Sequence, residues 1–439
     1  MNLHVAAGEQ PFYPQVANHL INDPTPKDQA IYVPSVTPGY AMDVYTKNWK
    51  RPLPAGVEPH DLNFLDPKTK LFRISHVMSS AGQALEQSRP CIITQRDRTH
   101  TIMIGDSGGY QVANGSKKID PETDRLRILR WLETNADVAM TLDVPTGPVK
   151  RPDYRYRNTQ QCLDATLSHL QFFDRHRQNE KTIFLNVLQG NTALEADAWY
   201  DKVKIFDFEG WAFAGVLRHN FYHLCRRILT MADENLLQNK KWIHVLGTSE
   251  LETGVLLTAL QRAINKHINR NLRISFDTST PFRQLGWGTI YTVPRFDADR
   301  MVMCTDTIPD GRELVQSKLR WPWPSALGDR MTLGDICVND IDEFGSHRDM
   351  QSYHLLSHHN LSAQCYAVNL ANRVYDSESV QHRHTIAIDA GRGVEAIERV
   401  IASGSMMELG KFQSVFRALR HGVDPKSDDE LREPKISEN

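Results

Sequence analysis

The chain has 439 residues, of which 40% are hydrophobic and 24% are charged, and its formal net charge is -2. This composition is typical of a soluble globular protein with a sizeable core, and it gives no overall basic surface for nucleic acid. No apolar stretch approaches the roughly 20 residues of a membrane span, and the first residues do not resemble a signal peptide. The six cysteines lack paired spacing, so we expect reduced thiols, a cytoplasmic location and no membrane association.

The N-terminal part of the chain predicts little regular structure. Residues 1–60 are rich in Pro, Asn, Asp and Gly, and their apolar pieces, such as Ala30 to Val33, are short. We therefore predict an irregular N-terminal extension over residues 1–70. The apolar spacing of residues 72–87 favours a helix, and residues 91–94 favour a short strand.

From residue 101 onward, short apolar runs alternate with segments of helical periodicity. Strands are predicted at residues 101–105, 138–142, 182–188, 210–213, 242–246 and 272–276. Helices are predicted between and after them at residues 121–134, 157–177, 192–202, 219–232 and 250–268. Strands that alternate with helices form βαβ units and a parallel sheet. Six successive units fit either a (β/α)8 TIM barrel or a doubly wound sheet.

Polar side chains follow four of these predicted strands directly, namely Asp106, Asp143, Gln189 and Asp277. A barrel builds its active site from the loops at the carboxyl ends of its strands. A doubly wound fold would instead place a glycine-rich phosphate turn after the first strand, and no G-x-G-x-x-G sequence is present. We therefore predict an α/β protein with a (β/α)8 barrel formed by residues 71–281 and 351–402.

Two further regions interrupt or follow the barrel. Residues 282–350 break the strand–helix alternation, and we predict an insertion or small subdomain there. Helices are predicted at residues 351–373 and 391–402. The charged tail, residues 424–439, is predicted to be disordered.

Motifs at the strand ends point to one enzyme family. The sequence Asp-Ser-Gly-Gly-Tyr-Gln occupies residues 106–111, and Thr-Leu-Asp-Val-Pro-Thr-Gly occupies residues 141–147. Four more motifs follow in order: Asn-Val-Leu-Gln-Gly at 186–190, Gly-Trp-Ala-Phe-Ala-Gly-Val at 210–216, Leu-Gly at 246–247, and Phe-Asp at 276–277 with Pro281 and Arg283. Over roughly residues 70–380 the chain resembles the tRNA-guanine transglycosylases. Enzymes of that family exchange a guanine base for a 7-deazaguanine, so the resemblance implies a pentosyltransferase.

The resemblance implies two catalytic carboxylates. Asp277 would be the nucleophile that attacks the sugar C1′ and forms a covalent glycosyl-enzyme intermediate. Asp106 would act as a general base towards the incoming base, or would position it. A retaining glycoside hydrolase on a barrel also needs two carboxylates, but it has no need of the base-binding residues that follow.

The resemblance also implies a guanine-binding pocket. Asp143 would accept hydrogen bonds from guanine N1–H and the exocyclic amine, while Gln189 and the backbone N–H of Gly215 would face O6. Tyr110 would stack on the base. The remaining base-binding residues would be Ser107, Gly108 and Leu246.

The family's zinc motif is missing. Transglycosylases usually carry a Cys-x-Cys-x-x-Cys sequence and a downstream histidine, and only His359 of this set aligns here. A structural zinc site normally needs four ligands. We therefore expect no cofactor in catalysis and no ordinary zinc site, and an atypical site of Cys304, Cys337, His347 and His359 is left open.

The sequence after the nucleophile loop favours DNA over tRNA as the substrate. Residues 282–287 read Phe-Arg-Gln-Leu-Gly-Trp and lack the family's arginine-rich stretch. The chain looks more like the branch that inserts 7-cyano-7-deazaguanine into DNA, with proteins of a DNA-modification system as partners. The target deoxyguanosine would have to leave the stack. A tRNA-acting enzyme and a non-catalytic nucleic-acid-binding paralogue are the alternatives, and retention of both Asp106 and Asp277 argues against the latter.

Aromatic and basic residues near the predicted insertion and the C-terminus are candidates for nucleic-acid contacts. The tryptophans that could stack on bases are Trp287, Trp321 and Trp323. The cations that could hold phosphate are Lys318, Arg320, Lys411, Arg417 and Arg420.

Overall fold

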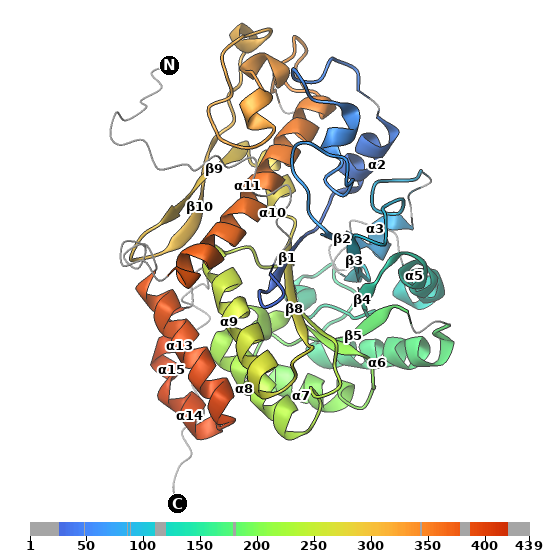
Figure 1. Ribbon diagram of the computed structural model, residues 1–439. Helices are drawn as coiled ribbons and strands as arrows, with labels where there is room; N and C mark the ends of the chain where they lie inside the picture. The colour runs from blue at the N-terminus through green and yellow to red at the C-terminus, as the bar shows by residue number, and fades with distance from the viewer. Residues whose placement is uncertain are drawn as a thin grey trace, which may run out of the picture.

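The protein is a parallel eight-stranded barrel surrounded by helices (Figure 1). The computed structural model describes residues 26–47, 49–85, 87, 89–109, 120–178, 181–342, 345–377 and 387–419. The strands are β1 (Ile31–Pro34), β2 (His76–Ser80), β3 (Ile102–Asp106), β4 (Val138–Met140), β5 (Ile183–Leu188), β6 (Gly210–Phe213), β7 (Trp242–Val245) and β8 (Arg273–Thr278). Their order in the sheet is β1-β8-β7-β6-β5-β4-β3-β2.

The two ends of this sheet meet. Val36 N donates a hydrogen bond to Met78 O at 3.2 Å, and Ser35 forms a parallel bridge with Met78. Strand β1 therefore continues the sheet into β2 and nearly closes the ring. The predicted (β/α)8 barrel is confirmed.

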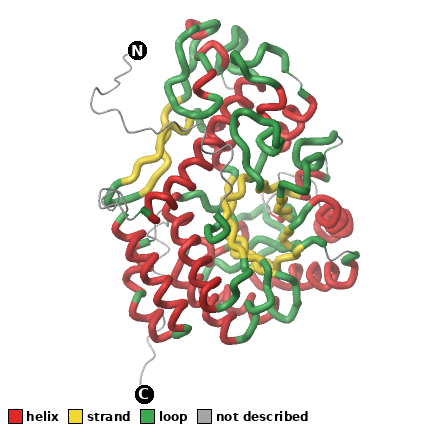
Figure 2. The backbone as a smooth tube through the Cα atoms, in the orientation of Figure 1, coloured by secondary structure: helices red, strands yellow, loops and turns green. Residues whose placement is uncertain are grey.

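Helices cover the outside of the barrel, as the red tubes around the yellow strands show in Figure 2. They are α5 (Pro121–Asn135), α6 (Thr159–His176), α7 (Ala193–Val203), α8 (Phe221–Asp233) and α9 (Leu251–His267). Local capping fixes several starts. Asn158 accepts from Gln161 N at the start of α6, and Thr192 forms a capping box with Glu195 at the start of α7. All six predicted strands and all five helices are confirmed to within a few residues.

Three expectations near the N-terminus are wrong. Residues 31–34 belong to the barrel as β1 instead of lying in an irregular extension, and residues 76–80 form β2 where a helix was expected. Only Ala81–Ala84 is helical there, as α3. Residues 91–94 form a turn instead of a strand, with Thr94 Oγ1 accepting from Cys91 N at 3.3 Å. Short strands buried on both faces carry no alternation, so their apolar pattern does not separate them from other buried segments.

The barrel interior is filled by side chains from alternate positions of the strands. These inward residues form one apolar cluster: Ile31, Val33, Met78, Ile104, Val138, Met140, Leu185, Val187, Ala212, Ala214 and Trp242, with Ile102, Ile183 and Leu246 against it. The residues between them face the helices, where Phe184, Trp211 and Phe276 lie in a second cluster. The two-residue period therefore decides which strand residues reach the mouth of the barrel.

The region after β8 adds a helix, a hairpin and a long loop segment. Helix α10 (Thr280–Gly286) leads into the antiparallel pair β9 (Thr289–Phe296) and β10 (Met301–Thr307). Helix α11 (Met350–Asp376) follows; it is 27 residues long and packs against β9 and α9 (Figure 1). The other α-helices are α2 (Pro38–Thr46), α13 (Ile388–Ser403), α14 (Met406–Lys411) and α15 (Gln413–Ala418). The 3-10 helices are η1 (Pro59–Leu62), η2 (Gly147–Lys150), η3 (Gly215–Arg218), η4 (Arg312–Leu314), η5 (Gly328–Arg330) and η6 (Leu333–Asp335).

The predicted helices at 351–373 and 391–402 correspond to α11 and α13. The tail at 424–439 lies outside the described residues. Among the helices of the described ranges, none combines the length and apolarity that crossing a membrane requires.

We expect Ile31→Ala to destabilise the protein by about 2–5 kcal/mol, because it removes a side chain buried inside the barrel. Urea unfolding of the full chain measures the change. Ile205→Ala is the matched control, since Ile205 is 75% exposed, and it should change the free energy of unfolding by less than about 0.5 kcal/mol. Equal effects of the two substitutions would contradict the place of β1 in the barrel.

Candidate active site

The predicted catalytic carboxylates point into the same mouth of the barrel. Asp106 ends β3 on the inward side defined by Ile102 and Ile104, and Asp277 follows Ser275 on the inward side of β8. In the ring, β3 and β8 are separated only by β2 and β1. The two acids therefore lie at the carboxyl ends of nearby strands, where a barrel builds its site.

The two carboxylates influence each other electrostatically. Burial raises the pKa of Asp106, and the negative charge of Asp277 raises it further. Hydrogen bonds from the Ser80 side chain and the Gly108 backbone oppose this rise. Ser80 is the register partner of Asp106 on β2. Asp106 therefore holds a proton at higher pH than an exposed aspartate, as a group that exchanges protons with a substrate needs.

Asp277 is fixed through one of its two oxygens. Its Oδ1 accepts a hydrogen bond from Gly247 N at 2.8 Å and lies 3.2 Å from His244 Nε2. Within the described residues, Oδ2 accepts no hydrogen bond. Gly247 has a φ of +65°, a conformation that favours glycine, and this directs its N–H at the carboxylate. One oxygen is thus anchored, and the other remains available for reaction.

A chain of buried hydrogen bonds supports this anchor from inside the barrel. Trp242 Nε1 donates to Ser275 Oγ at 2.6 Å, and Ser275 Oγ lies 2.7 Å from His244 Nδ1. The Ser275 hydroxyl can accept from the indole and still bond Nδ1, whereas the carboxylate of Asp277 can only accept. His244 Nε2 then carries the proton that is donated to Asp277. The chain of contacts fixes the orientation of the His244 ring.

Asp143 and Gln189 form the second polar pair at the mouth. Gln189 Nε2 donates to Asp143 Oδ2 at 2.7 Å, and both side chains are buried. Burial raises the pKa of Asp143 to about 7, and the charge of Asp106 acts in the same direction while the Gln189 hydrogen bond opposes it. The loop after Asp143 is held by Tyr154, whose hydroxyl donates to Pro145 O at 2.7 Å.

The Ser107–Gly108 turn brings a further polar group to this pair. The Ser107 hydroxyl is buried beside Asp143, and its hydrogen bond to that carboxyl opposes the rise of the Asp143 pKa. Gly108 has a φ of +97°, and a Cβ there would lie 2.6 Å from the Cα of Gly82. The turn therefore requires glycine, and it places the Ser107 hydroxyl against the Asp143 carboxylate.

The remaining predicted base-binding residues occupy the neighbouring strand ends. Gly215 begins η3 against Gly190, the residue that follows Gln189, and its N–H has no intrahelical acceptor. Leu246 follows β7 and packs against the apolar cluster inside the barrel. Tyr110 lies outside the described residues. The structure thus brings the described members of the predicted site to one end of the barrel.

The candidate nucleic-acid contacts do not form one surface. Trp321 is buried and packs edge-on against Trp323 and His359, whereas Trp287 is 59% exposed. The exposed cations fall into two groups. Lys318 and Arg320 lie in the segment between η4 and η5, whereas Lys411 and Arg417 lie in α14 and α15. Arg420 lies outside the described residues.

The residues aligned with the family's zinc site do not fit a zinc ion. His359 Nε2 donates to Tyr291 O at 2.9 Å, and its Nδ1 lies 2.8 Å from Ser325 Oγ, so both ring nitrogens are engaged. Burial lowers the pKa of His359 to about 4, which keeps the ring neutral. His347 Nδ1 faces Val338 O at 3.2 Å. The described residues contain no group of three or more His, Cys, Asp or Glu side chains placed to hold a metal ion.

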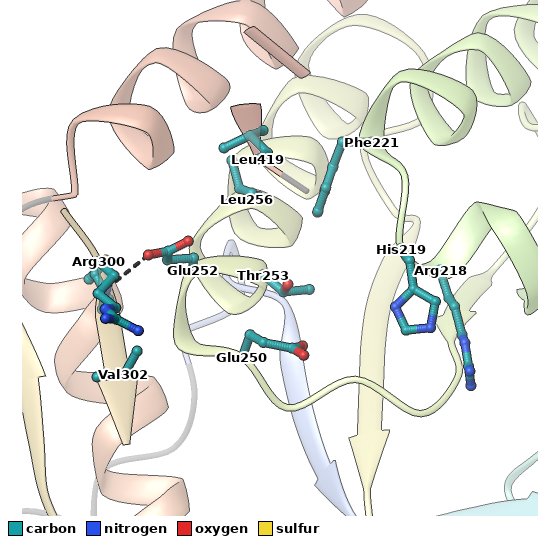
Figure 3. A pocket seen from close by; sticks show the side chains of 11 residues that line it. Arg218, His219, Phe221, Glu250, Glu252, Thr253, Leu256, Arg300, Val302 and Leu419 are labelled. Carbon is teal, nitrogen blue, oxygen red and sulfur yellow. Dashed lines mark hydrogen bonds between the residues drawn. The ribbon is translucent and has the colours of Figure 1, made fainter. Parts of the chain in front are cut away.

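A cavity of about 130 Å³ lies beside the mouth, between the loop after β6, the start of α9 and strand β10 (Figure 3). Its walls include Arg218, which packs so closely over Gly247 that a Cβ there would lie 2.8 Å from Nη1. Glu252 accepts from Met301 N at 2.9 Å, and Glu250 accepts from Thr248 Oγ1 at 2.6 Å. None of the residues predicted for the site lines this cavity.

Comparison with protein-family models and with curated proteins gives no match to the chain.

Sequence reasoning missed His244 and Ser275. Both lie at inward positions, His244 two residues after Trp242 and Ser275 two residues before Asp277. A polar residue in an apolar strand, in phase with the predicted catalytic aspartate, was the available signal. Only the pairing of β7 with β8 shows that the His244 and Ser275 side chains face each other.

We expect Ser275→Ala to destabilise the protein by about 2–4 kcal/mol, because it leaves the buried Trp242 Nε1 and His244 Nδ1 without a partner. Denaturant unfolding measures the loss. Ser279→Ala is the control, since the Ser279 side chain makes no capping hydrogen bond, and it should be close to neutral. A neutral Ser275→Ala would show that the chain of hydrogen bonds is not formed.

Proposed function

We propose that the protein is a guanine transglycosylase that exchanges guanine in DNA for a 7-deazaguanine, namely 7-cyano-7-deazaguanine, through a covalent aspartyl-glycosyl intermediate. One observation carries the proposal: Asp106 and Asp277 share a barrel mouth with the buried Asp143–Gln189 pair. The motif order from residue 106 to residue 283 supports the same family of reactions.

The polar groups at the mouth suit a guanine edge. An ionised Asp143 accepts from N1–H and the exocyclic amine, two donors that adenine does not offer in this arrangement. The second Gln189 N–H and the Gly215 N–H would donate to O6 from the neighbouring strand ends. Ser107 Oγ lies beside Asp143 and adds one more polar group at this edge.

The reaction requires two displacements at one carbon. Asp277 Oδ2 attacks C1′ of the target deoxyguanosine, the C1′–N9 bond breaks, and its electron pair leaves on N9 of guanine, which takes up the proton of Asp106. The hydrogen bonds to Oδ1 keep the attacking oxygen in place. Asp106 then accepts the N9 proton of the incoming 7-deazaguanine, whose N9 attacks C1′ as the ester C–O bond breaks and returns its electrons to Asp277.

We propose DNA as the substrate because the residues after the nucleophile loop depart from the arginine-rich sequence of the tRNA enzymes. His359 aligns with the zinc-binding histidine of the tRNA enzymes, but both of its ring nitrogens form hydrogen bonds within the protein. This is a second departure from those enzymes. The target base must be extruded or single-stranded for C1′ to reach Asp277.

We expect Asp277→Asn to abolish base exchange and the trapping of a covalent protein–DNA adduct, because an amide oxygen is a poor nucleophile. The assay is incorporation of labelled guanine into single-stranded DNA, duplex DNA and tRNA, with denaturing electrophoresis for the adduct. Asp299→Asn, at an exposed loop aspartate, is the matched control and should leave exchange unchanged.

Normal turnover by Asp277→Asn would refute the nucleophile assignment. Exchange into tRNA but into neither form of DNA would show that the substrate is tRNA. Absence of exchange into all three nucleic acids by the unmodified protein would overturn the proposal itself.

Base binding should release a proton below pH 7, because the two N–H donors of the base favour ionised Asp143, whose pKa in the free protein is about 7. Titration calorimetry with guanine or 7-cyano-7-deazaguanine, in buffers of different ionisation enthalpy, measures the release. At pH 6 we expect close to one proton per base bound, and at pH 8 about none.

The control for this measurement is Asp143→Asn, which keeps an acceptor for Gln189 but has no proton to lose. It should bind the base more weakly and without pH-dependent proton release. The Asp143 carboxyl ionises near pH 4 in the unfolded chain and near pH 7 in the folded protein. The folded protein therefore loses stability as the pH rises from about 4 to about 7. The asparagine variant should therefore be more stable than the parent at pH 8, by on the order of 1–3 kcal/mol. Equal proton release by parent and variant would exclude Asp143 as its source.

A further inference from the structure

Helix α10 presents an exposed face next to the nucleophile strand. It begins at Thr280, three residues after Asp277, and it buries Pro281, Phe282 and Leu285. The exposed positions are Arg283, Gly286 and the following Trp287, which are spaced three and four residues apart. Such positions share one side of a helix. The exposed face of α10 therefore consists of an arginine, a glycine and a tryptophan.

This face is held rigidly. Asn360 of α11 donates from Nδ2 to Pro281 O at 2.9 Å, and its Oδ1 accepts from Tyr291 N at 2.8 Å. The Phe282 ring packs edge-on against Tyr40, with 5.6 Å between centroids. The buried Asn360 side chain thus connects α10 to both α11 and the β9–β10 hairpin. The helix that carries the exposed residues is therefore held in place.

Arg283 and Trp287 form a stacked pair. The Arg283 Cζ lies 5.3 Å from the centre of the Trp287 ring, and Trp287 remains 59% exposed. Arg283 has no carboxylate partner within the described residues, and a Cβ at Gly286 would meet nothing within 4 Å. The pair is therefore an open aromatic surface with an unneutralised cation beside it, and its two members follow Asp277 by ten and six residues.

The tryptophans at positions 321 and 323 pack against each other instead of lying open. Trp321 and Trp323 contact each other with ring centroids 4.7 Å apart, and Trp321 also packs on His359. Trp287 differs because its surroundings leave the indole open while the neighbouring helix is fixed. An exposed indole next to an arginine suits a nucleobase and its phosphate, since bases stack on aromatic rings and arginine pairs with phosphate.

We propose that Trp287 and Arg283 form a stacking platform for the nucleotide adjacent to the target deoxyguanosine in a DNA strand. The base stacks on the indole, and the arginine contacts its phosphate. This inference rests on the proposed function and adds the site that holds the extruded or single-stranded DNA near Asp277.

The test is binding of the full chain to a fluorescein-labelled, single-stranded DNA with one dG among thymidines. We expect Trp287→Ala to weaken binding about 5- to 100-fold, and Trp287→Phe to retain most of the affinity. Tyr45→Ala is the matched control, because Tyr45 is an exposed aromatic residue on α2, and it should bind normally. Thermal unfolding checks that each variant is folded.

Oligonucleotides with an abasic site on either side of the dG locate the contact. With the stacked base missing, the parent should bind as weakly as Trp287→Ala does to the intact strand, and Trp287→Ala should lose nothing further. Arg283→Gln should reduce the dependence of affinity on salt concentration by about one phosphate contact.

Normal binding by Trp287→Ala, while the parent still forms the Asp277 adduct, would overturn the platform and leave the proposed function standing. A loss that is the same on intact and abasic strands would also overturn it. If the parent neither binds DNA nor forms an adduct, the platform and the proposed function fail together.

Discussion

The contact between β1 and β2 is the constraint on which the rest of the structure depends. In an open sheet of the same strand order, β3 and β8 would lie near opposite edges, and Asp106 and Asp277 would be far apart. The hydrogen bond from Val36 N to Met78 O joins those edges. Closure leaves only β2 and β1 between the two acids, and it turns eight separate strand ends into one mouth.

Closure also creates an electrostatic cost. Three aspartates meet in a low-dielectric space, and the raised pKa values of Asp106 and Asp143 express that cost. The barrel offsets part of it with donors from its own wall. Gln189 serves Asp143, while Gly247 and His244 serve Asp277. Sites that favour reaction over stability commonly carry such strain, and here it is confined to one layer of inward side chains above an apolar interior.

Much of the fold could be predicted from the sequence because β3 to β8 each end at a polar or glycine-rich turn and precede an amphipathic helix. Strands β1 and β2 lack that signature. Strand β1 is only four residues long, so its apolar residues fit an irregular segment equally well. Strand β2 runs directly into α3, so its apolar residues fit a helix. Both acids were predicted because they stand at strand ends. His244 and Ser275 were missed because their role depends on which strand lies beside which, and the sequence pattern of a single strand does not carry that information. The sequence also could not separate exposed Trp287 from packed Trp321, since that difference arises from α11 and the loops after β10.

The pairing of β1 with β8 has a consequence for synthesis of the protein. Ala30 N, just before β1, donates to Thr258 Oγ1, a residue 228 positions further along the chain. At typical translation rates of about 5–20 residues per second, β1 waits on the order of ten seconds or more for the segment it joins. During that interval the nascent chain carries an unpaired parallel edge, of the kind that chaperones shield from aggregation. The mouth of the barrel can therefore be completed only after β8 has been synthesised.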